Sequence, residues 1–208
     1  MAAKAKHASM SPRHTRILLT LGAFLAGLIA CFTIVLLVSG QFTGPSARPT
    51  AAIGGPFSLT DQEGRTATDR DFRGRPFLVF FGFTHCPDVC PTTLFDVSEI
   101  MRLLGPDAER VGAAFITVDP ERDTPAALKD YLSSFDPRLK GLTGDTDAIA
   151  AVAKAYRVYF KKVPLDAGGY TMDHTAIVYL MDKQGRFVSP FSLKRTTEAA
   201  VADLRKHL

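Results

Sequence analysis

The sequence predicts an α/β fold in which a mixed sheet is flanked by helices. Apolar runs at 77–83, 111–118 and 175–181 have the length and continuity of buried strands. Between the runs, apolar residues recur at helical spacing. The chain then closes with a β-hairpin and a last helix, which adds antiparallel pairing to a pattern otherwise typical of parallel strands.

The first elements of the domain follow from turn and helix-start signals. Residues 57–60 and 65–68 flank Asp-Gln-Glu-Gly and predict a short N-terminal hairpin. The run 77–83 is continuously apolar, as expected of a central strand covered on both faces. Pro91 is expected at the first position of the next helix, which Gly105-Pro106 ends.

The alternation continues through the second half of the chain. Here Asp-Pro, Thr-Pro and Asp-Lys-Gln-Gly segments separate the elements. The remaining strands are expected at 111–118, 175–181 and 186–190, and the remaining helices at 124–135, 145–157 and 196–207. The sequence therefore predicts one folded domain, with no internal repeat.

A charge-free apolar segment, residues 17–38, precedes this domain. At about 1.5 Å per residue it is about 33 Å long, which is enough to cross a hydrocarbon core of about 30 Å. The apolar part of a secretory signal peptide is shorter. We therefore expect a basic tail at 1–16, an uncleaved transmembrane anchor at 17–38, a Gly- and Pro-rich linker at 39–53 and the domain at 54–208.

The basic residues that precede the anchor predict a cytoplasmic N-terminus and an exported domain. Leu28–Cys31 resembles the lipobox of bacterial lipoproteins, but apolar residues follow Cys31 instead of a polar linker. We therefore interpret Cys31 as a small apolar residue of the membrane helix, with lipidation as the alternative. The other two cysteines lie beyond the membrane, where disulfides can form.

The charge distribution argues against nucleic-acid binding. Residues 1–56 carry five basic side chains and no acidic one. The rest of the chain therefore holds 20 of the 25 basic residues and all 21 acidic residues. The basic surplus therefore belongs to the tail. No basic surface is implied on the domain.

The cysteine pair, Cys86 and Cys90, lies between the first central strand and a helix. A separation of four residues places both thiols on one helical face, where they could form a disulfide or bind a soft metal. A helix N-terminus favours thiolates and is expected to lower the cysteine pKa. The layout is thioredoxin-like, although three residues separate these cysteines where thioredoxin-type enzymes have two.

His174 is the candidate for a third metal ligand. Two thiolates and one imidazole suit Cu(I) and can adapt to Cu(II). From the residues alone, a hydrogen-bonded histidine at the start of a strand is the favoured alternative. Asp173 could support the imidazole, whereas Met172 is interpreted as a core or loop residue and the His85 side chain is expected to point away. The acidic residues in 119–123 are interpreted as turn and helix-capping groups.

In combination, these segments resemble the Sco/SenC family of copper proteins that serve cytochrome c oxidase assembly. The matching segments, in order over residues 54–208, are Phe81–Pro91, Val118–Pro125, Gly141–Gly144, Tyr156–Tyr159 and Asp173–Leu180. The resemblance implies a thioredoxin-like fold with an N-terminal hairpin. It also implies copper binding by Cys86, Cys90 and His174, with Asp173 supporting the site.

The resemblance further implies a membrane-anchored protein that delivers copper to the CuA-bearing subunit of cytochrome c oxidase. Such a protein would receive copper from an upstream donor. We expect it in the bacterial inner membrane as a single-pass protein, with its C-terminal domain in the periplasm. The alternative is a thiol–disulfide reductase that keeps the copper-binding cysteines of the oxidase reduced. Both roles need Cys86 and Cys90, but only copper delivery strictly needs His174.

Overall fold

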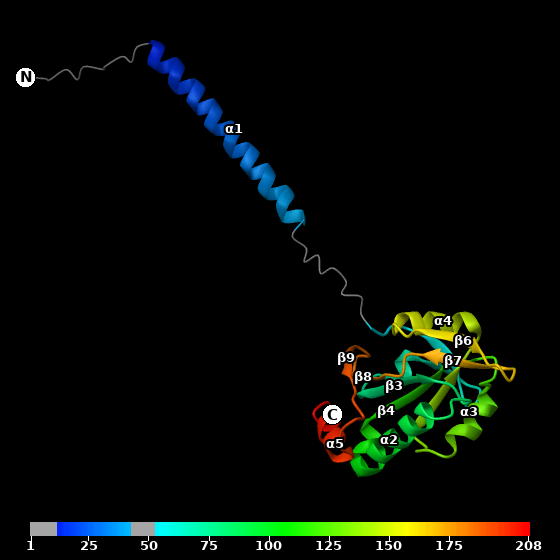
Figure 1. Cartoon of the computed structure of the whole chain (residues 1–208). Coiled ribbons are helices and arrows are strands. Elements are labelled where there is room, and N and C mark those ends of the chain that lie inside the picture. The colour runs from blue at the N-terminus through cyan, green and yellow to red at the C-terminus, as the bar shows by residue number, and fades with distance from the viewer. Residues whose placement is uncertain (1–11, 43–52) are drawn as a thin grey trace, which may run out of the picture. The chain divides into compact units, whose positions relative to one another are not determined.

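The computed structural model describes residues 12–42 and 53–208 (Figure 1). The chain separates into two compact units, with the division between Thr50 and Ala51. Most of the predicted tail at 1–16 and of the predicted linker at 39–53 lies outside the described residues.

The first unit contains one helix, α1 (Pro12–Phe42), which extends beyond both ends of the predicted anchor. The side chains described in α1 are those of residues 16, 17 and 19–35, and all are exposed. Within the described residues, no helix combines the length and the apolarity that crossing a membrane requires. The anchor at 17–38 stays a prediction.

The second unit is built on a seven-stranded mixed sheet. Its strands, in spatial order, are β2 (Thr66–Thr68), β1 (Ser58–Asp61), β5 (Leu139–Thr143), β4 (Gly112–Thr117), β3 (Phe77–Gly82), β8 (Val178–Met181) and β9 (Phe187–Pro190). The three strands β5, β4 and β3 run parallel, and the other pairs are antiparallel. Every residue of β3 and β4 is buried, as the continuous apolar runs predict.

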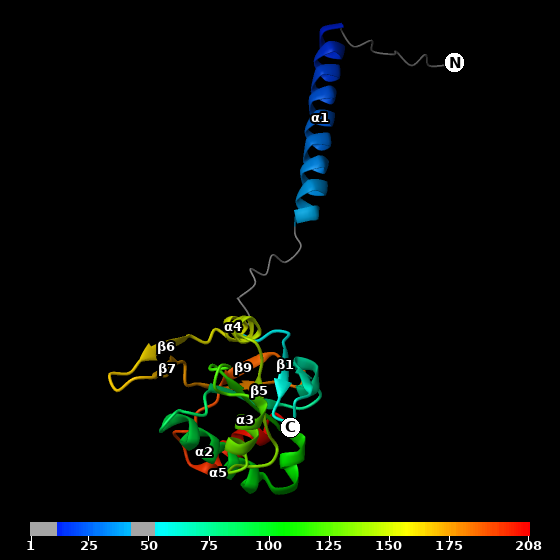
Figure 2. The ribbon, with the colours of Figure 1, turned by 90° about the vertical axis from the view of Figure 1, so that its right-hand side faces the viewer.

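Helices cover both faces of this sheet. They are α2 (Val89–Leu104), α3 (Pro125–Leu132), α4 (Thr146–Ala155) and α5 (Thr197–Arg205), with short 3₁₀ helices at Asp69–Phe72 and Gly105–Arg110. Figure 2 shows α4 on one side of the sheet and α2, α3 and α5 on the other. The predicted mixed α/β, thioredoxin-like architecture with an N-terminal hairpin is therefore confirmed.

Two parts of the fold differ from the prediction. Strand β5 and the hairpin of β6 (Phe160–Pro164) with β7 (Tyr170–His174) were not predicted. Neither has a continuous apolar run, because β5 includes Lys140 and Gly141 and β6 includes two lysines, and every residue of β6 is exposed or half-buried. The predicted strand at 175–181 is shorter, since β8 begins at Val178, and His174 ends β7 instead of starting a central strand.

The helix after the cysteines also begins earlier than predicted. Asp88 precedes the first turn, Val89 is the first helical residue, and Pro91 is the third. Proline is tolerated there because N–H groups in the first turn have no helical partner. Cys90 therefore lies inside the first turn, whereas Cys86 lies in the loop that leads to it.

Candidate metal centre

The cysteine pair lies where the loop after β3 turns into α2. The amide of Cys86 donates to the carbonyl of Phe83 at 3.2 Å, which closes a turn. The amide of Cys90 in turn donates to Cys86 Sγ at 3.3 Å. Both side chains are buried, with Cys86 8% and Cys90 0% exposed, and both thiols are free. The loop therefore brings the Cys86 sulfur against the first turn of α2, within 4.8 Å of the Cys90 sulfur.

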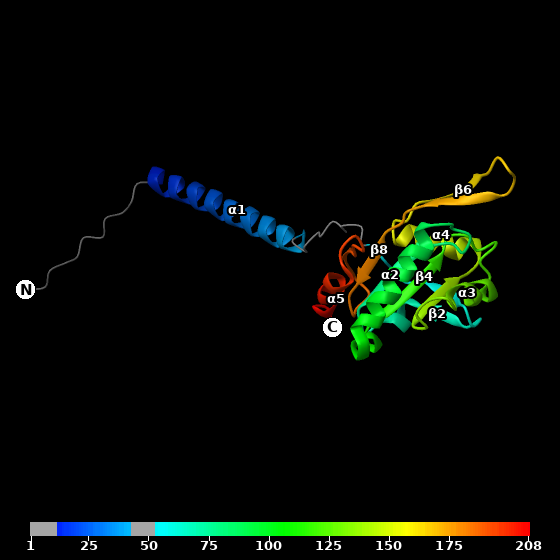
Figure 3. The same ribbon diagram turned by 60° about the horizontal axis from the view of Figure 1, so that its bottom comes forward.

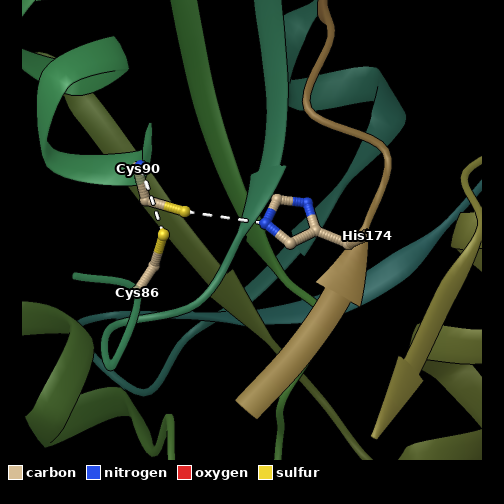
Figure 4. Close-up of side chains that lie close together, drawn as sticks. All are labelled: Cys86, Cys90 and His174. Atoms are coloured by element: carbon tan, nitrogen blue, oxygen red, sulfur yellow. Dashed lines mark hydrogen bonds between the residues drawn. The ribbon is translucent and has the colours of Figure 1, made fainter. Parts of the chain in front are cut away.

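His174 brings an imidazole to the cysteine pair from the end of β7. Its Nε2 lies 3.8 Å from Cys90 Sγ, and its Nδ1 lies 3.1 Å from the carbonyl oxygen of Thr175 (Figure 4). A carbonyl oxygen can only accept, so Nδ1 donates and Nε2 keeps its lone pair toward the sulfur atoms. The ligand atoms of Cys86, Cys90 and His174 all lie within 4.8 Å of one another.

Burial keeps the imidazole and the inner thiol neutral before any metal binds. Burial lowers the pKa of His174, and the Thr175 carbonyl and the Asp173 carboxylate oppose this effect. Burial also raises the pKa of Cys90, and the neighbouring Cys86 thiol adds to the rise. The prediction that the helix N-terminus lowers the pKa is therefore wrong for Cys90, because desolvation of the thiolate outweighs the helix dipole.

The site depends on a glycine at the end of β3. A Cβ atom at Gly82 would lie 2.7 Å from Cys90 Sγ and 2.7 Å from a ring carbon of Phe115. Side chains at this position would therefore displace the thiol. A glycine inside an otherwise apolar strand is the sequence signal for such a close approach, and the sequence reasoning did not use it.

Aromatic rings hold the imidazole on its other sides. The ring of Phe83 meets His174 edge-on, with centroids 5.7 Å apart, and Phe80 does so at 6.4 Å. Both phenylalanines are almost fully buried. They limit the rotation of the imidazole and exclude water from one side of it, while His174 itself remains half-buried.

The acidic loop after β4 has a larger role than turn formation and capping. Asp123 is fully buried and accepts hydrogen bonds from Thr84 N at 3.0 Å, Thr84 Oγ1 at 2.6 Å and Thr117 Oγ1 at 2.6 Å. The cap of α3 is instead Thr124, whose hydroxyl accepts from the Ala127 amide. Asp123 therefore fixes the loop that carries Cys86, because Thr84 precedes this cysteine by two residues.

The three remaining candidates, Asp173, Met172 and His85, are not part of the cluster of Cys86, Cys90 and His174. Asp173 is exposed and acts on His174 through its charge. Met172 is buried, as interpreted from the sequence. The His85 side chain is 54% exposed, its Nδ1 lies 3.0 Å from Thr84 Oγ1, and it is not part of the cluster of Cys86, Cys90 and His174.

A protein-family model described as SCO1/SenC matches residues 45–208. This chain belongs to the SCO1/SenC family. A relative named Protein SCO2 homolog, mitochondrial, from Bos taurus is 44% identical over 162 residues, which cover 76% of this chain and 61% of the relative. The match thus spans about three fifths of that curated relative. The SCO2-like protein RP587 of Rickettsia prowazekii is 41% identical over 143 residues, which cover 68% of this chain and 70% of the relative.

Solved SCO1/SenC structures share the fold of the second unit. Bradyrhizobium japonicum ScoI with copper bound is 65% identical, with a TM-score of 0.73 over 76% of this chain and 100% of that chain. Yeast Sco1 with copper bound is 37% identical, with a TM-score of 0.69 over 75% of this chain and 88% of that chain. Copper binding is therefore a property of two SCO1/SenC proteins to which this chain is similar in sequence and in fold.

Proposed function

We propose that this chain binds copper through Cys86, Cys90 and His174 and delivers it to the CuA centre of cytochrome c oxidase. The observation that carries the proposal is the convergence of two thiols and one imidazole, whose ligand atoms lie within 4.8 Å of one another. Thiolate and imidazole ligands suit copper, and a set of three suits the low coordination number of Cu(I). The copper-bound structures of two relatives support the choice of metal.

Copper binding requires the thiols to lose their protons, whereas His174 is already neutral and keeps the lone pair of Nε2 toward the sulfur atoms. Cys90 is fully buried, but Cys86 is 8% exposed and His174 is half-buried. The outer edge of the ligand set is therefore the accessible one. A ligand from the acceptor could bond to copper there while one of the three departs, which is transfer by ligand exchange. Asp173 supports the imidazole through its charge.

We propose that the acceptor is the CuA-bearing subunit of cytochrome c oxidase and that an upstream donor supplies the copper. BsSco, which matches this fold with a TM-score of 0.61 at 21% identity, is described as a member of the Sco family of cytochrome c oxidase assembly proteins. Family membership supports the same role here. The apolar segment 17–38 and its basic flank support a single-pass anchor in a bacterial inner membrane, with the domain in the periplasm.

A thiol–disulfide reductase is the second candidate function, and one contact favours it. The amide of Cys90 donates to Cys86 Sγ and so keeps the partly exposed Cys86 thiol beside the buried Cys90 thiol, as a dithiol that exchanges with a disulfide requires. A reductase of this kind would keep the copper-binding cysteines of the oxidase reduced. It would not require His174, whose Nε2 faces Cys90 in a position suited to a metal ligand.

The test measures copper stoichiometry, copper affinity and the dithiol reduction potential of the full chain in detergent. The wild type is compared with His174→Ala and, as a matched control, with His85→Ala. We expect one copper per chain in the wild type and in the control. We expect His174→Ala to lose more affinity than the roughly 10–100-fold that removal of a residue supporting a ligand costs.

Two results would overturn this proposal. One is equal copper affinity in His174→Ala and the wild type, which would remove His174 from the ligand set. The other is weak copper binding in all three proteins together with rapid disulfide exchange in all three. That second result would establish the reductase instead.

A further inference from the structure

The ligand His174 belongs to a hairpin that stands apart from the main sheet. Within the described residues, β6 and β7 pair with each other and with no strand of the seven-stranded sheet. Figure 3 shows this hairpin projecting from the domain. His174 ends β7 and is paired with Phe160. The distance between the imidazole and the cysteines therefore depends on the contacts that hold the hairpin to the rest of the domain.

One set of contacts joins the hairpin to the loop after β4. Tyr170, at the start of β7, donates its hydroxyl to Asp119 Oδ1 at 2.9 Å. Arg122 Nη1 donates to the Tyr170 carbonyl oxygen at 3.0 Å, and the guanidinium group lies 3.8 Å from the centroid of the Tyr170 ring. Arg122 Nε also donates to Asp119 Oδ2 at 2.5 Å. Asp119 is only 1% exposed and the Arg122 side chain 24%, so the Asp119 end of these charge-assisted bonds is shielded from solvent.

The same loop also holds the cysteine side of the site. Asp123, four residues after Asp119, accepts both hydrogen bonds of Thr84 and so fixes the approach to Cys86. Thr117 joins the two aspartates, since its hydroxyl donates to Asp123 and accepts from the Asp119 amide. Residues 117–123 thus connect the two halves of the metal centre, which are far apart in the sequence.

A second route leads from the loop to the imidazole through an aromatic ring. The Arg122 guanidinium lies 5.9 Å from the centroid of Phe83, and the Phe83 ring packs edge-on against His174. Arg122 therefore contacts both the hairpin that carries the ligand and the ring that limits its rotation. The Lys162–Glu121 ion pair also joins the hairpin to this loop, but both of its side chains are exposed, and such pairs contribute little.

We propose that Asp119, Arg122 and Tyr170 form a brace that positions His174 for copper, an inference that rests on the proposed function. None of the three touches the copper ligands, so each is a positioning residue. With the brace intact, Nε2 stays beside the two sulfur atoms. When the Tyr170–Asp119 hydrogen bond is lost, the hairpin samples positions in which the imidazole lies farther from the cysteines. The affinity for copper then falls in proportion to the fraction of time that the imidazole remains beside them.

The test compares Tyr170→Phe with Tyr159→Phe in the full chain in detergent. Both substitutions remove one phenolic hydroxyl, but the Tyr159 side chain is 55% exposed. We expect Tyr170→Phe to bind Cu(I) about ten-fold more weakly, equal to about 1.4 kcal/mol, and to shift the thiolate-to-Cu(II) absorption band. The control is expected to match the wild type in both measurements.

A double-mutant cycle separates positioning from general destabilisation. If Tyr170 acts through His174, then Tyr170→Phe has no further effect on copper affinity in the His174→Ala background. An equal ten-fold loss in both backgrounds would refute the brace while leaving the copper ligands unchanged. Unchanged affinity of Tyr170→Phe in the wild-type background would refute it as well.

A measurement on metal-free protein tests the brace separately from the proposed function. The Thr175 amide donates to the Tyr159 carbonyl at the base of the hairpin, so its hydrogen exchange reports hairpin opening. In metal-free protein we expect exchange at Thr175 to be about ten-fold faster in Tyr170→Phe than in Tyr159→Phe, as a hydrogen bond of about 1.4 kcal/mol implies. Equal exchange rates would refute the brace even if the chain bound no copper.

Discussion

Replacing Gly82 with alanine tests whether the close approach of β3 to Cys90 is essential to the metal centre. The backbone at Gly82 is not in the left-handed region, so alanine is free of backbone strain there. The conflict is between side chains. The new Cβ would lie 2.7 Å from Cys90 Sγ and 2.7 Å from Phe115 Cε2. Both of these residues are fully buried, so neither can move into solvent.

The expected size of the effect follows from two opposing terms. Adding one methyl group to a packed core costs about 1–3 kcal/mol. Replacing glycine with alanine restricts the unfolded chain and restores about 0.4–1 kcal/mol. At the middle of both ranges the net loss is about 1.3 kcal/mol, which lowers the Tm by about 3–5 °C for a domain of this size. Copper affinity also falls, because the thiol moves away from the position that faces His174.

Thermal unfolding and copper titration of Gly82→Ala check this reasoning, with Gly55→Ala as the matched control. A Cβ atom at Gly55 would meet only the Ala155 methyl group, at an ordinary 3.4 Å. We expect the control to keep the wild-type Tm or exceed it slightly. If Gly82→Ala kept both the wild-type Tm and the wild-type copper affinity, the argument that Gly82 makes room for the thiol would be wrong.

Three further predictions follow. Because its pKa is raised, Cys90 keeps its thiol proton in the folded chain, whereas the unfolded chain loses that proton above about pH 8.5. The free energy of unfolding of the metal-free protein should therefore fall by up to about 1.4 kcal/mol per pH unit above that pH, and Cys90→Ala should lack this fall. Urea unfolding at several pH values checks this, and an equal dependence on pH in both proteins would contradict it. Asp123→Ala removes a buried acceptor of three hydrogen bonds and should lower the free energy of unfolding by about 2–4 kcal/mol. The control Asp173→Ala, at an exposed position, should lower it by less than about 0.5 kcal/mol. Comparable midpoints of urea unfolding in the two variants would contradict this. NMR titration of the metal-free protein should place the His174 pKa below its ordinary value of about 6.5, because the imidazole is buried. The pKa should be lower still in Asp173→Asn, because the Asp173 carboxylate raises it. A higher His174 pKa in that variant would contradict the role given to Asp173.

The sequence alone determined the features that depend on neighbouring residues. The run 77–83 is buried as β3, and the apolar spacing after Pro91 forms α2, which ends at Leu104 before Gly105. The contact between Cys86 and Cys90 is local as well, although not helical, because Cys86 lies before the helix and its sulfur accepts the Cys90 amide in the first turn. Such features need no knowledge of the rest of the chain.

The tertiary structure alone decided how the third ligand reaches this pair. His174 lies 84 residues beyond Cys90, and no periodicity relates the two. The periodicity placed His174 at the start of a central strand, whereas it ends the separate hairpin of β6 and β7. Its distance to Cys90 depends on that hairpin and on the Asp119 and Asp123 carboxylates that connect the two halves of the site. Both carboxylates follow a strand in a turn-forming segment, so only their burial distinguishes them from ordinary loop residues.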